Sequence, residues 1–155
     1  MHPVVAEALS RDKGAAPLTG VVGALANTRL FSLCSGRDLK KVAKLAKVRN
    51  FPKGTRLITE GDDGESMYVL LSGVARVSRN GRKVAALGAG EAVGELALLG
   101  RAKRNATVDA DSDLEVAELS RRSMSKLVHE VPAFSLKLLE AMAERVRELD
   151  NRIYH

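Results

Sequence analysis

Short β-like runs fill the middle of the chain, and residues with helical spacing flank them on both sides. The runs cover residues 56–60, 67–71, 74–78, 83–87, 106–110 and 114–119. Asn80-Gly81 lies between two of these runs and is a strong hairpin signal, because both residue types accept the positive φ of a tight turn. Short strands joined by close turns predict an antiparallel roll or barrel.

Three segments have helical character instead. The first has apolar residues at helical intervals after a candidate capping side chain: Leu39, Val42, Ala43 and Ala46, with Ser35 or Asp38 as the cap. Residues 123–129 predict a short helix, and Pro132 opens a longer one that runs to about Tyr154. The expected fold is therefore mainly β with flanking helices. It is a jelly-roll-like β-roll with an N-terminal helix, an embedded helical turn and C-terminal helices.

Two units divide the chain in this interpretation. Residues 1–28 predict a loosely organised extension, in which residues 4–9 could form a short helix that packs on the domain or on a partner. Residues 29–155 predict one domain, since a chain of 155 residues has the length of a single core.

A Gly-Glu pair followed by a small basic loop carries the clearest chemistry. Gly94 and Glu95 open a short apolar turn, and Arg104 comes just before a strand-like run. Unpaired N–H groups at the start of a helical turn attract an anion, and arginine grips phosphate with a planar, permanently charged fork. A carboxylate only accepts hydrogen bonds, so Glu95 suits a hydroxyl group and not a phosphate. Together these groups predict a pocket for a sugar phosphate.

This stretch, residues 93–108, closely resembles the phosphate-binding cassette of the cyclic nucleotide-binding domain family. Residues 57–73, with glycines at Gly61, Gly64 and Gly73, resemble the early β-roll of the same family. The resemblance spans about residues 30–149. It implies a regulatory domain that binds a cyclic nucleotide, with cAMP favoured over cGMP as the ligand.

The resemblance also implies roles for individual residues. Arg104 would hold the cyclic phosphate, and Glu95 would accept the ribose 2′-hydroxyl. Gly94, Leu96 and Ala97 would act through their backbone. Asn105 stands where the family usually has Ala, Ser, Thr or Gln. It could bind the phosphate or a base edge, or satisfy nearby backbone, and Ala106 completes this group of binding residues.

The last helix carries a second set of expectations. By resemblance to the similar domain of a bacterial potassium channel, Arg145 would stack over the base, and the helix would close over the bound ligand as a lid. Apolar residues recur along the helix at steps of three and four, which is compatible with packing on its own domain or with a homodimer seam: Leu139, Met142, Val146, Leu149 and Ile153.

Composition bears on the kind of partner and on the cellular compartment that the chain fits. The net charge of +6 suits an anionic ligand, but the basic residues are spread along the chain and aromatic residues make up only 3%, so no direct nucleic-acid site is evident. The single cysteine, Cys34, fits a reducing cytoplasm, and no apolar run is long enough for a membrane span.

The histidines have no metal-ligand spacing and no catalytic motif appears, which predicts a binding domain without cofactor and not an enzyme. An effector domain or protein would read the ligand. The alternatives are the sensor half of a Crp-like transcription regulator and a ligand-free interaction module on the same scaffold.

Overall fold

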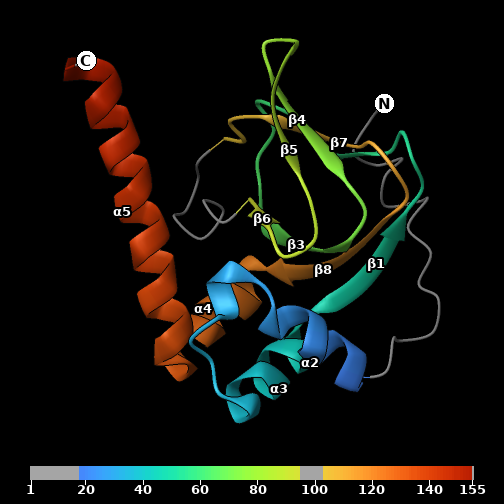
Figure 1. The fold of residues 1–155 in the computed structure, drawn as a ribbon, viewed down its shortest axis with the longest axis vertical. Coiled ribbons are helices and arrows are strands. Elements are labelled where there is room, and N and C mark those ends of the chain that lie inside the picture. Colours follow the sequence, from blue (N-terminus) through green and yellow to red (C-terminus); the bar gives the residue numbers. More distant parts are fainter. Residues whose placement is uncertain (1–17, 95–102, 155) are drawn as a thin grey trace.

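The computed structural model describes residues 18–94 and 103–154, whose strands form two antiparallel four-stranded sheets (Figure 1). One sheet has the order β1-β8-β3-β6 and the other β2-β7-β4-β5. The strands are β1 (Lys47–Phe51), β2 (Arg56–Ile58), β3 (Ser66–Ser72), β4 (Ala75–Arg79), β5 (Arg82–Leu87), β6 (Ala92–Val93), β7 (Thr107–Ala110) and β8 (Leu114–Ser120). This arrangement confirms the predicted β-roll.

Helices surround the roll at its base and side (Figure 1). They are α2 (Leu18–Ala26), the 3-10 helix η1 (Arg29–Phe31), α3 (Gly36–Leu45), α4 (Arg121–Glu130) and α5 (Pro132–Tyr154). The Ser35 hydroxyl accepts a hydrogen bond from the Asp38 N–H at 3.1 Å and so caps α3, and the Ser120 hydroxyl caps α4 in the same way. The two C-terminal helices therefore begin and end close to their predicted positions.

Alternation along β3 separates two apolar cores. Met67 and Val69 face the helices and join a core that contains Phe31 and Phe134, whose rings stack with centroids 5.5 Å apart. Tyr68 and Leu70 face the other sheet and contribute to a core inside the roll. Since successive side chains of a strand point to opposite faces, one strand serves both cores.

The segment before residue 29 contains more structure than its composition suggests. Residues 18–26 form α2, and the side chains of Val21 and Leu25 are buried against α3 and the neighbouring helices. The helical signal is weak because Gly20 and Gly23 lower helix propensity. Where the domain begins stays a prediction, and residues 1–17 lie outside the described part of the chain.

Two strands were missing from the prediction. β1 reads as polar because Lys47, Arg49 and Asn50 interrupt its apolar residues, and β6 is only two residues long. In the structure β1 pairs along its whole length with β8, from Lys47 opposite Glu118 to Phe51 opposite Leu114. It therefore forms an edge of the sheet and part of the inner wall of the roll.

Candidate functional site

Arg104 stands at the head of an inward-facing row of side chains. The next members of that row, Ala106, Val108 and Ala110, are buried in the core inside the roll. Arg104 itself is half-buried and lines a cavity of about 330 Å³ together with Phe51 and Tyr68. A permanent positive charge thus lines this cavity just before β7 begins at Thr107.

Two glycines let the backbone approach the Arg104 side chain closely. Gly94 has a φ of +88°, and a Cβ there would lie 2.6 Å from Arg104 Nη1 and 2.9 Å from the Ser66 carbonyl oxygen. A Cβ on Gly64 would overlap the guanidinium on its other side, at Nε and Cζ. The guanidinium Nη2 donates a hydrogen bond of 2.6 Å to the Ser66 carbonyl. The arginine is therefore enclosed by backbone and held in one orientation.

A buried polar cluster shares the cavity with Arg104. Arg49 Nε donates to Glu118 Oε1 at 2.6 Å, and these two side chains are only 13% and 18% exposed. Tyr68 also hydrogen-bonds Glu118, and burial, with the Glu118 charge as a further cause, raises the tyrosine pKa well above its usual value. The phenol therefore stays neutral and donates to the carboxylate.

The cavity also contains a polar atom that lacks a protein partner. The Thr59 hydroxyl is buried and lines the same cavity, and it has no hydrogen-bond partner among the residues that the structure describes. Burying a hydroxyl without a partner costs free energy.

The basic loop before β7 is only partly involved. Lys103 forms an exposed ion pair with Asp63, Nζ to Oδ1 at 2.7 Å, which lowers the pKa of that carboxyl. Its charge therefore lies at the rim, outside the cavity. Arg101 is outside the described residues.

The structure brings together some of the predicted site residues. Gly94 and Arg104 are in contact, and Ala106 follows in the inner core. Asn105 is exposed, and its backbone oxygen accepts a 3.1 Å hydrogen bond from Arg79 Nε. The other predicted residues lie outside the described part, either entirely or in their side chain: Glu95, Leu96, Ala97 and, in α5, the side chain of Arg145.

Sequence reasoning missed several groups around Arg104. Gly64, Ser66 and Tyr68 lie within the segment that resembles the early β-roll, but their position around Arg104 was not predicted, and neither was the cluster of Arg49 and Glu118. The inward alternation of β3 and β8, once paired in register, would have placed Tyr68 directly opposite Glu118. That pairing depends on long-range register, which the local pattern does not give.

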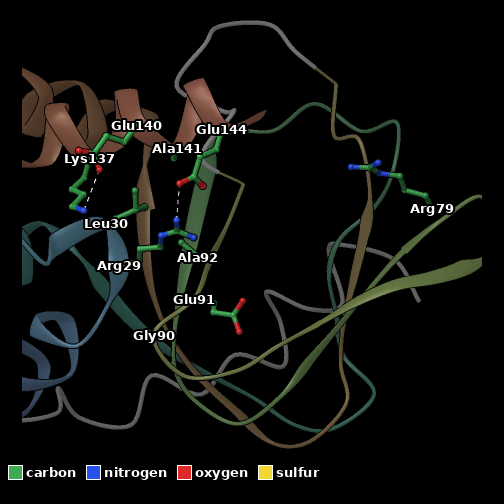
Figure 2. A pocket seen from close by; sticks show the side chains of 10 residues that line it. All are labelled: Arg29, Leu30, Arg79, Gly90, Glu91, Ala92, Lys137, Glu140, Ala141 and Glu144. Atoms are coloured by element: carbon green, nitrogen blue, oxygen red, sulfur yellow. Dashed lines mark hydrogen bonds and ion pairs between the residues drawn. The ribbon is translucent and has the colours of Figure 1, made fainter. Parts of the chain in front are cut away.

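A second cavity, of about 390 Å³, separates α5 from η1 and the Gly90–Ala92 segment (Figure 2). Figure 2 shows Arg29 reaching across it to Glu144, with Nη2 and Oε1 2.8 Å apart. Both side chains are largely exposed, at 77% and 44%, so this ion pair holds the middle of α5 only weakly.

The predicted apolar seam of α5 is mostly uncovered where the structure describes it. Leu139 and Val146 are 67% and 65% exposed, whereas Phe134 and Leu138, nearer the start of the helix, are buried. The first turns of α5 therefore belong to the core, and beyond them Met142 packs against it partly buried while Leu139 and Val146 face away.

The part of the chain that the structure describes contains neither a metal-binding cluster nor a membrane-spanning helix. No group of three or more His, Cys, Asp or Glu side chains is placed to hold a metal ion there. Nor does any helix in that part of the chain have the length and apolar character needed to cross a membrane.

Comparison with known proteins agrees with this geometry. The family model described as "Cyclic nucleotide-binding domain" matches residues 48–130. The chain is 34% identical over 107 residues to the cyclic AMP receptor protein of Thermus thermophilus, covering 66% of this chain and 50% of that protein. It is 31% identical over 104 residues to a cGMP-dependent protein kinase of Toxoplasma gondii, covering 67% of this chain and 10% of the kinase.

A solved structure extends the agreement to three dimensions. The crystal structure of the Thermus thermophilus catabolite activator protein superposes with a TM-score of 0.76 at 30% identity, covering 81% of this chain and 62% of that one. The chain thus spans about half the length of the first of these curated relatives. The matched family model, the roll and the enclosed arginine together assign the chain to the cyclic nucleotide-binding domain family.

Proposed function

We propose that this domain is a regulatory module that binds a cyclic nucleotide, with cAMP favoured over cGMP, and that binding changes the position of α5. The observation that carries the proposal is Arg104, a half-buried cation fixed between Gly94 and Gly64 and directed into a cavity. A guanidinium in a partly desolvated site binds a phosphate more strongly than one in water. The preference for cAMP is supported by the name of the Thermus relative, and the Toxoplasma kinase supports the alternative ligand, cGMP.

The remaining roles extend this proposal. Glu95 accepts the ribose 2′-hydroxyl, while Gly94, Leu96 and Ala97 offer backbone groups to the sugar phosphate. The carboxylate cannot donate to a phosphate, so it distinguishes the sugar from the charged end of the ligand. Arg145 stacks over the base, where a guanidinium and an aromatic ring attract each other.

Calorimetric titration with cAMP, cGMP and 2′-deoxy-cAMP tests the proposal. We expect saturable binding of cAMP at one site per chain, weaker binding of cGMP, and weaker binding of 2′-deoxy-cAMP because the hydroxyl contact is lost. In the Glu95→Ala variant the two cAMP forms should bind nearly equally, because the group that distinguishes them is gone.

Two outcomes of this titration would contradict the proposal at different levels. Absence of binding for all three compounds would reject the nucleotide-binding function. Equal discrimination by wild type and Glu95→Ala would assign the hydroxyl contact to another group and leave the function itself intact.

The coupling to α5 rests on the uneven attachment of that helix. Phe134 and Leu138 anchor its first turns in the core, while further along the helix Met142 is only partly buried and Glu144 forms an exposed ion pair with Arg29 of η1. Exposed ion pairs contribute little to stability. The part of α5 beyond the core therefore has a low free-energy cost of movement, which is the property expected of an element that closes over a ligand.

Hydrogen exchange measured with and without saturating cAMP tests this coupling. Amides of residues 143–154 should gain protection on binding, because the ligand would hold the end of α5 in place. Amides of residues 134–138 should change little, since they are already fixed by the buried Phe134 and Leu138. Unchanged exchange across residues 143–154 at saturation would mean that α5 is only structural.

A second candidate function is the sensor half of a Crp-like transcription regulator. It is favoured by the share of the Thermus relative that the chain spans, which is 50%. The output would then come from an effector segment or partner, and the exposed seam of α5 would serve a homodimer. Reading the coding sequence on either side of this segment separates this candidate from a module that acts alone.

A further inference from the structure

The loop of residues 61–66 is held from one side by Arg104. The Gly61 N–H donates to the Arg104 carbonyl at 2.8 Å, and the Arg104 N–H donates to the Asp62 carbonyl at 2.7 Å. The Arg104 side chain then returns to the end of the same loop, where Nη2 donates to the Ser66 carbonyl. Backbone and side-chain hydrogen bonds therefore join the loop to Arg104 at both of its ends.

Arg121 holds the same loop from the other side. It is the first residue of α4, and its N–H donates to the Glu65 carbonyl at 2.6 Å. Its guanidinium Nη2 donates to the Gly64 carbonyl at 3.1 Å, across 57 positions of sequence. The side chain is partly buried, so water replaces this hydrogen bond only incompletely.

Gly64 lies between the two arginines. Its carbonyl accepts from Arg121, and its Cα lies against the Arg104 guanidinium so closely that no Cβ fits. A shift of this peptide toward Arg104 would collide with the guanidinium, and a shift away would leave that face of the guanidinium unsupported. The position of the Gly64 peptide thus sets where the Arg104 fork lies.

We propose that Arg121 is a positioning residue for ligand binding: by fixing the Gly64 carbonyl, it holds the Arg104 guanidinium in the orientation that grips the phosphate. The inference rests on the proposed function and deepens it, because it names a residue that acts through Arg104 without touching the ligand. A ligand-binding group is effective only when supporting residues hold it to within about 0.5 Å of the productive position. Arg121 supports the Arg104 guanidinium in this way.

The Arg121→Met variant tests the inference. Methionine resembles the unbranched apolar part of the arginine side chain, and its backbone N–H can still donate to the Glu65 carbonyl. It lacks the guanidinium that donates to the Gly64 carbonyl. We expect cAMP affinity to fall about tenfold, the equivalent of one net hydrogen bond. Arg122→Met is the matched control, because Arg122 is the next residue and is exposed, and it should bind within about twofold of wild type.

A double-mutant cycle separates positioning from general loosening of the fold. In an Arg104→Ala background, Arg121→Met should cause no further loss of affinity, because its effect passes through the guanidinium that is already absent. Arg121→Lys should restore part of the wild-type affinity, since an ammonium can still donate to the Gly64 carbonyl. An equal loss in both backgrounds, or wild-type affinity in Arg121→Met, would overturn the inference and leave the nucleotide-binding function standing.

A ligand-free measurement keeps the inference testable apart from that function. The Arg104 Nε–Hε resonance of arginine-labelled protein, assigned with Arg104→Lys, reports the surroundings of the guanidinium. It should shift in Arg121→Met and stay in place in Arg122→Met. An unchanged resonance would overturn the inference. If wild type binds no cyclic nucleotide, the proposed function fails and the affinity role of Arg121 fails with it, whatever the resonance shows.

Discussion

Replacing Arg104 by alanine is expected to weaken cAMP binding by at least about 30-fold while the fold stays intact. Removing one partner of a desolvated charge pair costs about 2–5 kcal/mol, and each 1.4 kcal/mol is about tenfold in affinity. Arg104 is half-buried and enclosed by Gly64 and Gly94, so its guanidinium is held at a defined place in the cavity. Calorimetry gives the affinity, and circular dichroism checks that the variant is folded.

Lys103→Ala is the matched control for this prediction. Lys103 is the adjacent cation, but its ammonium is paired with Asp63 at the rim and is 66% exposed. Its removal should change cAMP affinity by less than about threefold, because exposed charges interact weakly in water. If Arg104→Ala is folded and binds cAMP nearly as well as wild type, Arg104 is not the phosphate ligand. A loss of equal size in Lys103→Ala would point to general electrostatic attraction instead.

The Glu118→Ala variant should lose about 3 kcal/mol of unfolding free energy, near the lower end of the range for a broken buried ion pair. Its removal takes the carboxylate partner from the Arg49 guanidinium, which is 13% exposed, and the acceptor from the Tyr68 hydroxyl. A buried charge that loses its counter-charge is costly because the interior solvates it poorly. Urea unfolding followed by circular dichroism measures the change as a lower midpoint.

Two comparisons isolate the cause of this loss. The double variant Arg49→Leu/Glu118→Leu should recover most of the stability, because an apolar pair of similar size needs no charge compensation. Glu144→Ala, which breaks the exposed pair with Arg29, should leave the midpoint nearly unchanged. A Glu118→Ala midpoint equal to wild type would mean that Arg49 reaches water or another acceptor, and that the pair contributes little.

The elements predicted well from the sequence are those with local signals. The Asn80-Gly81 turn joins β4 to β5 with φ values of 51° and 79°, as its residue types require. Ser35 caps α3 because it comes directly before the helix start at Gly36, and its hydroxyl accepts from the Asp38 N–H three residues further on. In each case the physical cause lies within a few residues, so the pattern carries the information.

β1 escaped prediction for the opposite reason. Its polar residues are tolerated on the inner wall because Glu118, 69 positions later, neutralises Arg49. The sequence around β1 shows only the charged residues, which indicate exposed chain and not a buried strand. The partner becomes visible only when the register between β1 and β8 is known.

The candidate site divides in the same way. Arg104 and Gly94 were predicted from a motif, and the structure places them in contact. The groups that orient Arg104 are mostly backbone carbonyls, such as that of Ser66. Every residue has a backbone carbonyl, so the residue type does not reveal which of them accepts the hydrogen bond. Arg121 looks like an ordinary basic residue at a helix start, and its hydrogen bonds to the Gly64 and Glu65 carbonyls become visible only in the structure.

The number of residues between Arg104 and β7 determines whether the Arg104 side chain points into the roll. Ala106, Val108 and Ala110 are buried inside the roll, and Arg104, two positions before Ala106, lines the cavity. Because successive side chains of extended chain alternate in direction, we expect an insertion or deletion of one residue between Arg104 and Val108 to turn the guanidinium out of the roll. A change of two residues would keep it inward. Grafts of this segment into other rolls should therefore preserve the even spacing from the arginine to the strand, and alignments that shift it by one do not describe the same site.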